Sequence, residues 1–350
     1  MVPDLHEWRA PIVIPHSRPF VGTDEVEAVD AVVRSGMLLG GGRVPTFCRA
    51  LSELTGLRGA TLFSSGRMAI RAALEALRLP PQSEVVVQTY VCDAVVWAIR
   101  QNGLNPVFCD VGDGWTATGE TVAAVWTPRC AAIVLAPPFG LYSPVQEFRQ
   151  FAAPIIHDLC QASPFAIQQV ADVDCGDTIA LSFHPTKYIC AAGGGALISK
   201  KDDPLAQSIA SMWADASPIG EVGAAMGQVQ LSRAHLFRRR RAEIASDYLA
   251  AAGTRADRLH ASFDAHHGDL LRLPLQSMRL RYDEVTAHFA SGGVTARRGV
   301  DQLAHRSVGQ PDRHFPNAIA RFEQTFSLPF YPALSEREQE TIADLLARLR

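Results

Sequence analysis

Short apolar runs and amphipathic segments alternate through the first two-thirds of the chain. Continuous apolar runs of this kind predict buried strands, and they lie at residues 60–63, 85–87, 106–110, 131–135, 154–158, 178–183 and 196–199. Segments between them have helical spacing or helix start and stop signals, at residues 24–34, 68–77, 94–100 and around 145–151. Repeated strand–helix units with continuous apolar strands predict a mainly parallel sheet covered by helices on both faces.

The pattern changes near residue 220, where longer helical stretches begin. We expect helices at residues 222–236, 238–249, 284–290, 316–323 and 335–349, and a strand-like piece at residues 271–274. A chain of 350 residues is long enough for two domains. The sequence therefore predicts an α/β domain over residues 1–240 and a smaller C-terminal α+β domain over residues 241–350.

Composition excludes several classes of protein. With 47% hydrophobic residues, 20% charged residues and a net charge of −3, the chain reads as an ordinary globular protein. This mild acidity gives no electrostatic reason to expect a nucleic acid or an anionic membrane as a partner. No apolar stretch approaches the roughly 20 residues of a membrane span. The run of four arginines at residues 238–241 is an exception in charge, either a solvated helix face or a contact for an anion or a second subunit.

The seven cysteines are odd in number and include no Cys-x-x-Cys pair. This pattern argues against a disulfide framework and against a zinc site built from thiolates, and we expect no metal. It favours a reducing compartment, so we expect the protein in the cytoplasm.

Lys187 is the first candidate for chemistry. Only three of the 33 basic residues are lysines, and Lys187 stands alone between an apolar run and three glycines. A lysine can lose its proton and attack a carbonyl, whereas an arginine stays protonated. The residue is therefore either a Schiff-base lysine or an ordinary surface lysine. Lys200 and Lys201, which precede two aspartates, have the features of a solvated turn.

Further polar residues follow the predicted strands, where ligands bind in parallel sheets. Ser65 and Gly66 open a helix, either as a phosphate cradle or as a simple cap. Asp158 could hold a protonated ring nitrogen, or could be a cap or a buried ion pair. Ser182 could bind a phosphate or end a strand, and the glycines at residues 193–195 allow close approach of the backbone. Together with Lys187, these groups predict a site for pyridoxal 5'-phosphate.

Several segments resemble the DegT/StrS family of sugar aminotransferases, which are fold-type-I pyridoxal phosphate enzymes. The resemblance covers nearly the whole chain and is most specific at Ser182-Phe-His-Pro-Thr-Lys187 and the following Gly-Gly-Gly-Ala-Leu-Ile-Ser. Other matching segments begin at Ser35, Ser65, Gly103, His157, Ala224 and Leu328. The resemblance implies a transferase that moves an amino group from glutamate or glutamine to a keto sugar, nucleotide-linked or not, or to a cyclitol-like ketone.

The resemblance also implies roles for individual residues. Lys187 and Asp158 would be catalytic, with Asp158 paired to the pyridine nitrogen and Gln161 near the 3-oxygen of the ring. The cofactor-binding set that it implies is Ser65, Gly66, Arg67, Met68, Tyr90, Cys92, Asp158, Gln161, Ser182 and Lys187. Family members are typically homodimers with a shared active site, and we expect the same here.

The chain departs from the family pattern at three places. Arg67 replaces the usual threonine, Cys92 stands at the usual aromatic position with Tyr90 two residues earlier, and residues 214–221 lack the usual asparagine motif. These departures leave two alternative functions open. One is a pyridoxal phosphate-dependent sugar dehydratase or eliminase, although the known dehydratases of the family carry histidine at the lysine position. The other is a regulatory protein that binds the cofactor or a sugar without turnover.

Overall fold

The structure is a computed structural model that describes residues 13–173, 176–199, 208–209, 212, 219–253 and 267–349. Residues 1–12, Cys175, Lys200, Lys201 and residues 214–218 are outside this part of the chain. Predictions that concern them are therefore not carried further.

The predicted runs form one seven-stranded sheet with the order β1-β7-β6-β5-β4-β2-β3. β7 is antiparallel to both of its neighbours, and the other adjacent strands are parallel. This confirms the expected mainly parallel α/β sheet. The strands are β1 Arg58–Phe63, β2 Glu84–Gln88, β3 Asn105–Cys109, β4 Cys130–Leu135, β5 Ile155–Asp158, β6 Thr178–Ser182 and β7 Gly195–Ser199.

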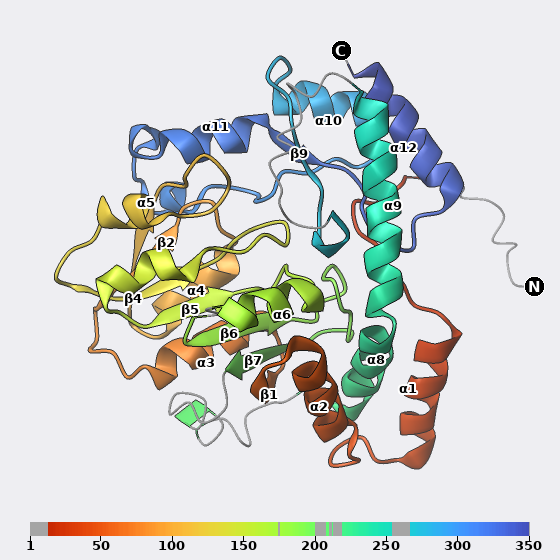
Figure 1. Ribbon diagram of the computed structural model, residues 1–350, viewed down its shortest axis with the longest axis horizontal. Helices are drawn as coiled ribbons and strands as arrows, with labels where there is room; N and C mark the ends of the chain where they lie inside the picture. The colour runs from red at the N-terminus through yellow and green to blue at the C-terminus, as the bar shows by residue number, and fades with distance from the viewer. Residues whose placement is uncertain are drawn as a thin grey trace, which may run out of the picture.

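Helices cover both faces of this sheet (Figure 1). The helices of this part are α1 Thr23–Ser35, α2 Arg43–Thr55, α3 Gly66–Ala76, α4 Asp93–Gln101, α5 Gly119–Ala123, α6 Pro164–Val173 and α8 Glu221–Ser232. Side chains alternate across a strand, so Val85 and Val87 pack in one core cluster with α3 and α4, while Val86 packs in another. Because both faces are covered, the strands are apolar throughout.

The C-terminal part begins along the long helix α9 Ala234–Ala252, which stands beside the sheet (Figure 1). It contains η3 His267–Asp269, β8 Pro274–Gln276, α10 Tyr282–Ser291, η4 Ala304–Val308, η5 Asp312–His314, α11 Pro316–Gln324, β9 Thr325–Ser327 and α12 Glu336–Arg348. Phe237 packs in a core of the large sheet, whereas Ile244 packs in the core around β8 and β9. The change of core along α9 is consistent with a division near residue 240, which stays a prediction.

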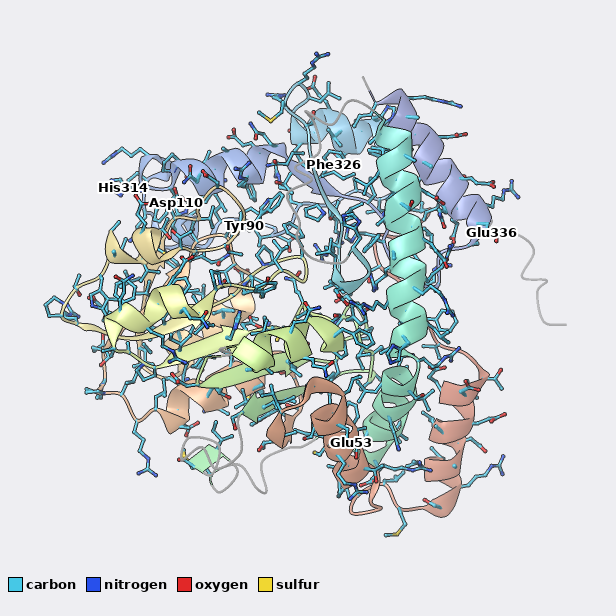
Figure 2. All side chains as sticks on the ribbon, in the orientation of Figure 1. Glu53, Tyr90, Asp110, His314, Phe326 and Glu336 are labelled. Atoms are coloured by element: carbon cyan, nitrogen blue, oxygen red, sulfur yellow. The ribbon has the colours of Figure 1, made fainter. Side chains whose placement is uncertain are left out.

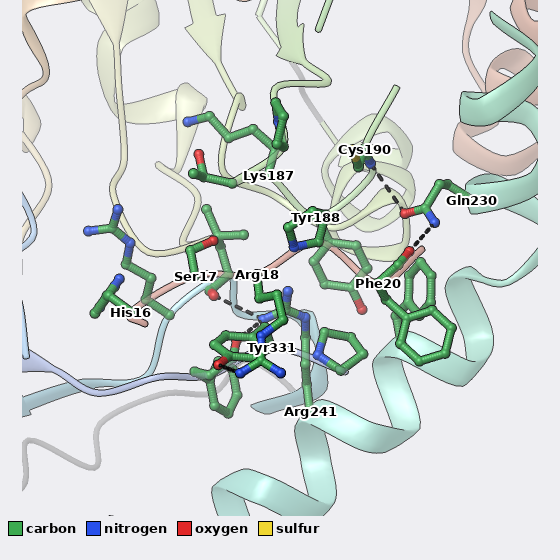
Figure 3. A pocket seen from close by; sticks show the side chains of 18 of the residues that line it. His16, Ser17, Arg18, Phe20, Lys187, Tyr188, Cys190, Gln230, Arg241 and Tyr331 are labelled. Atoms are coloured by element: carbon green, nitrogen blue, oxygen red, sulfur yellow. Dashed lines mark hydrogen bonds between the residues drawn. The ribbon is translucent and has the colours of Figure 1, made fainter. Parts of the chain in front are cut away.

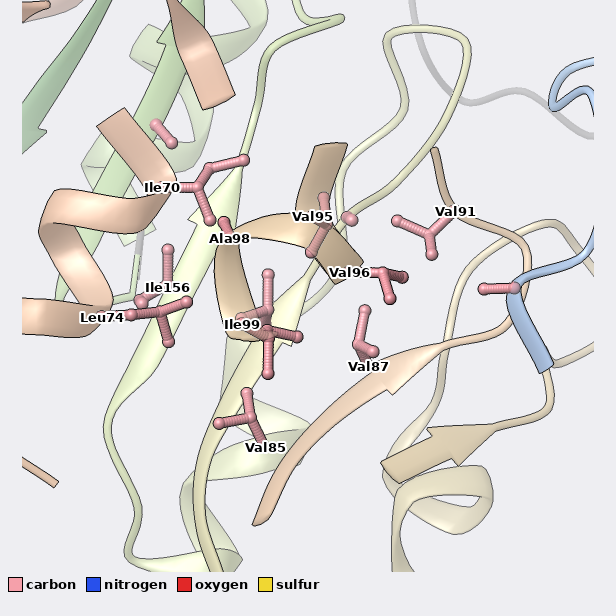
Figure 4. Packing of buried hydrophobic residues seen from close by; sticks show 14 of the residues in the cluster. Ile70, Leu74, Val85, Val87, Val91, Val95, Val96, Ala98, Ile99 and Ile156 are labelled. Carbon is pink, nitrogen blue, oxygen red and sulfur yellow. The ribbon is translucent and has the colours of Figure 1, made fainter. Parts of the chain in front are cut away.

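Part of the C-terminal region returns to the large sheet. Asp110, which follows β3, accepts hydrogen bonds from the backbone N–H groups of Asn317 and Ala318 at the start of α11 (Figure 2). Phe315 and Ala318 also join the core cluster that α3 and α4 form with the sheet. Figure 4 shows the part of this cluster between α3, α4 and the strands. The carboxylate of Asp110 therefore caps a helix that is distant in sequence.

Three local predictions were incomplete. Residues 145–151 form a 3-10 helix, η1 Val145–Phe151, instead of an α-helix. Leu271 donates its backbone N–H to the Phe139 carbonyl, so β8 begins only at Pro274. Helices α2, α5 and α6 were missed; α2 carries Pro45 in its first turn, where a proline removes no helical hydrogen bond. None of the helices in the described ranges is both long and apolar enough to cross a membrane.

Candidate active site

The carboxyl ends of β1, β5 and β6 border one cavity of about 370 Å³. β7 runs in the opposite direction, so its first residue, Gly195, lies beside the last residues of β1 and β6. This topology gathers segments that are far apart in sequence. The cavity is lined by Ser64, Ser65, Gly66, Arg67, Ile70, Cys92, Ala94, Asp158, Cys160, Ser182, His184, Lys187, Gly193 and Gly194.

The turn between β1 and α3 forms the first wall. The Ser65 hydroxyl caps α3 by accepting the backbone N–H of Met68 at 3.2 Å. A Cβ atom on Gly66 would lie 2.8 Å from the Ser182 Cβ, and one on Gly195 would lie 2.5 Å from the Gly66 nitrogen. Glycine is therefore required at both positions. The backbone at the start of α3 reaches the cavity with the positive end of the helix dipole behind it, which suits an anion.

Asp158 forms the second wall, at the end of β5. Its side chain is largely buried, with the residue 8% exposed, and its Oδ1 accepts the backbone N–H of Cys160 at 3.0 Å. Burial raises the pKa of this carboxyl, while the hydrogen bonds from Cys160 and the charge of Lys187 lower it. A cationic group in the cavity would stabilise the ionised carboxylate further.

Lys187 lies in the loop that joins β6 to β7. Its backbone N–H donates to the His184 carbonyl at 2.8 Å, and Phe183 and Gly194 close the base of the loop through a 2.9 Å hydrogen bond. The lysine is half-buried and lines the same cavity as Asp158. The amine and the carboxylate that the sequence singled out therefore belong to one site.

Arg67 and Cys92 also reach this cavity. The Arg67 guanidinium lies over the ring of Trp97, 5.1 Å from its centroid, so α4 supports a cation at the start of α3. Burial and the charge of Asp158 raise the pKa of the Cys92 thiol. The thiol is therefore neutral near pH 7 and supplies a small, weakly polar surface where the family usually has an aromatic ring.

Three predicted cofactor-binding residues do not line the cavity. Tyr90 is fully buried and packs with Phe139 toward the C-terminal part. Gln161 accepts the backbone N–H of Phe139 at 2.9 Å through its Oε1. Met68 contributes its backbone N–H to the cap on Ser65 and packs its side chain against the core. Their contacts with the cofactor stay predictions. None of the three residues is part of the lining of the cavity.

Two lining residues were given no role at the outset. Cys160 contacts the turn at Gly66, where its Sγ would lie 2.9 Å from an added Cβ, and burial raises the pKa of its thiol. His184 lines the cavity three residues before Lys187, and burial together with the charge of Lys187 lowers its pKa. Both residues belong to segments that matched the family, but their side chains carried no separate signal.

The arginine run at residues 238–241 is largely structural. Arg238 forms an ion pair with Asp269 at 2.7 Å, and Arg240 with Glu243 at 3.2 Å. Arg241 is 3% exposed and donates to the carbonyls of Leu271 and Phe330, so the interpretation of the run as a solvated face is wrong for this residue. Arg239 alone of the four is exposed.

The residues present fit pyridoxal phosphate. The turn at Ser65 and Gly66 offers backbone donors for a phosphate, and an added Cβ on Gly66 would close that turn. Ser182 adds a hydroxyl, Asp158 a carboxylate for a ring nitrogen, and Lys187 a primary amine. The volume of the cavity is within the range of small-molecule sites.

Comparison with known proteins agrees with this chemistry. Residues 19–347 match the model of the DegT/DnrJ/EryC1/StrS aminotransferase family. The spore coat polysaccharide biosynthesis protein SpsC of Bacillus subtilis (strain 168) is 25% identical over 384 residues, which cover 95% of each chain.

Solved structures share the fold. The PMP-form of Spr1654, a putative sugar aminotransferase from Streptococcus pneumoniae, superimposes with a TM-score of 0.85 at 20% identity, covering 96% of this chain and 97% of that one. The aminotransferase TlmJ from Streptoalloteichus hindustanus gives a TM-score of 0.84 at 25% identity, covering 95% and 97%. The chain therefore belongs to the DegT/DnrJ/EryC1/StrS aminotransferase family and is a pyridoxal phosphate-dependent aminotransferase.

Proposed function

We propose that this enzyme moves an amino group from glutamate or glutamine to a keto sugar, nucleotide-linked or free, or to a cyclitol-like ketone. The observation that carries the proposal is the presence of Lys187, Asp158 and the anion-binding turn at Ser65 and Gly66 around one cavity. The names of the relatives support a sugar as the acceptor. SpsC is named for polysaccharide biosynthesis, and the Spr1654 structure is titled a putative sugar aminotransferase.

The residues of the cavity divide the work between binding and proton transfer. Pyridoxal phosphate, when bound, supplies an aldehyde and an electron-withdrawing ring. Asp158 would hold the ring nitrogen in its protonated form, because a buried carboxylate is stabilised by a neighbouring cation. The turn at Ser65 and Gly66, with Ser182, would bind the phosphate. The amine of Lys187 would accept and return a proton on the substrate side of the site.

Absorbance of the purified protein tests this proposal. The protein loaded with pyridoxal phosphate should be yellow, and glutamate or glutamine should bleach the visible band. A panel of keto sugars and keto cyclitols should then restore the band, and the compound that does so identifies the acceptor. Lys187→Ala should bind cofactor but abolish both changes, and Asp158→Asn should slow them. A wild-type protein that stays colourless with added cofactor would contradict the proposal.

The same experiment separates the alternative functions. A deoxy keto product formed without any amino donor would indicate elimination instead of transamination. Tight cofactor binding without bleaching by any donor would indicate a regulatory protein. Lys187 favours transamination, because the known dehydratases of the family carry histidine at this position.

We also propose a homodimer that forms through α1 and the segment after it. Val26 and Val33 on α1, and Met37, Leu38 and Leu39 beyond it, are 52–76% exposed. Apolar residues that gather on one surface indicate an interface. Sedimentation velocity should give a dimer, and Leu39→Glu should shift it toward monomer, whereas Leu236→Glu on α9 should not. A monomeric wild-type protein would contradict this.

The cytoplasm is the proposed location. The six cysteines in the described ranges are free thiols, at residues 48, 92, 109, 130, 160 and 190. Proteins that keep several free thiols are typical of a reducing compartment. Cell fractionation should recover the protein with soluble cytoplasmic markers, and recovery in a secreted fraction would contradict this location.

A further inference from the structure

A second, narrow cavity lies on the other side of the Lys187 loop, between this loop and the C-terminal part (Figure 3). Lys187 belongs to both cavities, and the narrow one is also lined by His16, Arg18, Arg241 and Arg272. Its volume is about 20 Å³. A space of this size holds a water molecule or the end of a small group, and excludes a whole sugar ring.

Arg272 carries a positive charge at this cavity without a carboxylate partner. Its Nη1 donates to the Arg298 carbonyl at 3.2 Å, and among the described residues no Asp or Glu forms an ion pair with it. Burial lowers its pKa, and the like charge of Arg297 lowers it further, while the exposed Asp301 acts in the opposite direction. Most donors of this guanidinium therefore remain free for a ligand.

Arg297 brings a second positive charge near this cavity. Its backbone pairs with Ser327 of β9 in both directions, at 3.0 and 2.7 Å. The Ser327 hydroxyl in turn forms a hydrogen bond with His16, which lines the narrow cavity, so Arg297 lies near this cavity. Its side chain is exposed and has no ion pair within the described part of the chain. Two neighbouring cations that repel each other are both stabilised when an anion lies between them.

His16 adds no third charge. The Ser327 hydroxyl donates to the Arg297 carbonyl at 3.1 Å, so its oxygen accepts from the His16 Nε2–H at 3.0 Å. Burial and the charges of Arg272 and Arg297 lower the pKa of this histidine to about 3. The ring is therefore neutral in ordinary buffers and adds no charge to the cavity.

We propose that Arg272 forms an oxyanion subsite beside Lys187 that binds an anionic group of a substrate, with the charge of Arg297 adding to the positive potential there. This inference rests on the proposed function. A carboxylate on the amino donor and a phosphate on the acceptor share the chemistry that a guanidinium recognises. The donor's α-carboxylate is attached to the carbon that carries the amino group, so its site must lie close to Lys187. The narrow cavity, of about 20 Å³, is also of a size that suits a carboxylate and not a larger group.

The test compares the two half-reactions in Arg272→Gln, with Arg279→Gln as the control, because Arg279 is an exposed arginine of the same part of the chain. In Arg272→Gln, the glutamate concentration for half-maximal bleaching should rise about tenfold to a hundredfold, the effect of one hydrogen bond to a charged group. Glutamate α-amide lacks the α-carboxylate, so its concentration for half-maximal bleaching should be the same in Arg272→Gln and in wild type. Arg272→Lys should be intermediate, because it keeps the charge and loses the planar fork.

The half-reaction with the acceptor tests whether the anion is instead a phosphate on the acceptor sugar. If a phosphorylated keto sugar loses its advantage over the free sugar in Arg272→Gln while glutamate is unaffected, the subsite binds the phosphate. If the subsite binds the donor's carboxylate, succinate should bind the wild-type protein loaded with cofactor in a calorimetric titration. It should bind Arg272→Gln more weakly. If Arg272→Gln matches wild type in the donor half-reaction, the acceptor half-reaction and the titration, while wild type still bleaches with glutamate, the subsite is ruled out. The proposed function then stands. A wild type that does not bleach refutes the proposed function itself.

Discussion

The guanidinium of Arg241 lies over the ring of Tyr188, 4.9 Å from its centroid. Tyr188 follows Lys187 directly, and its hydroxyl donates to the Gly268 carbonyl at 2.8 Å. Arg241 also donates to the carbonyls of Leu271 and Phe330. A buried cation on α9 therefore connects the lysine loop to two segments of the C-terminal part.

Replacing Arg241 by methionine should destabilise the fold. The change leaves the carbonyls of Leu271 and Phe330 without this donor, and each unpaired buried group costs about 1–3 kcal/mol. We expect Arg241→Met to lower the free energy of unfolding by about 2 kcal/mol or more in urea titrations. Arg239→Met, on the exposed side of α9, should stay within about 0.5 kcal/mol of wild type. Equal stability of the two variants would show that Arg241 is not a structural link.

A methyl group on Gly195 should weaken cofactor binding. Its Cβ would lie 2.5 Å from the Gly66 nitrogen, so the turn that precedes α3 would have to move. We expect Gly195→Ala to lose cofactor at least about tenfold more easily on dialysis, which corresponds to 1.4 kcal/mol. Absorbance measures the cofactor retained, and circular dichroism checks the fold. Gly114→Ala, with no atom near its Cβ, should retain cofactor like wild type.

Cys92 should react with iodoacetamide in the cofactor-free protein and be protected by pyridoxal phosphate. The thiol lies in the cavity, where burial and Asp158 raise its pKa. Thiolate is the reactive form, so the labelling rate should increase with pH beyond the range where an ordinary cysteine levels off. Peptide mass spectrometry measures the labelling. Cys109 is fully buried and should stay unlabelled in both forms; labelling of Cys92 that ignores the cofactor would place the thiol outside the site.

Thr89 and His305 should contribute to stability as a pair. The Thr89 hydroxyl lies 2.6 Å from His305 Nδ1, and the ring's Nε2 lies 3.0 Å from Asp312 Oδ1. Thr89→Val keeps the shape and leaves a fully buried ring nitrogen unpaired, at a cost of about 1–3 kcal/mol in chemical unfolding. Thr286→Val, at a partly exposed position of α10 where the hydroxyl donates only to the Asp283 carbonyl of the same helix, should change stability by less than about 0.5 kcal/mol. A similar loss in both variants would mean that the hydroxyl of Thr89 is unimportant.

His16 should make the fold sensitive to acid. Its pKa falls from 6.5 to about 3 on folding, because of burial and the charges of Arg272 and Arg297. The unfolded chain therefore binds a proton between these values that the folded protein does not bind, and stability decreases as the pH falls below 6.5. His16→Gln should remove this part of the dependence. Denaturant midpoints from pH 7 to pH 4 measure it, and parallel curves for the two proteins would contradict the assignment.

Much of the fold followed from local patterns along the chain. Continuous apolar runs such as 131–135 identified the strands, because a strand buried on both faces needs apolar side chains throughout. The order of the strands then brings their carboxyl ends together, so the cavity around Lys187, Asp158 and Ser182 was predictable in outline. The family match had the same basis, since close contacts require glycine at residues 66 and 195, and Gly193 and Gly194 adopt positive φ angles.

Other features depend on contacts between segments that are distant in sequence. The sequence could not show that Arg241 is buried while Arg239 is exposed, because four adjacent arginines look alike until the neighbours of α9 are known. Tyr90 and Gln161 are directed away from the cavity by partners around Phe139, 22 residues from Gln161. Arg297 lies near the cavity that Arg272 lines because β9 holds Ser327 against residue 297 and the Ser327 hydroxyl forms a hydrogen bond with His16. The sequence by itself thus determined the family, the cofactor and the central lysine, and tertiary packing decided which polar side chains face the ligand.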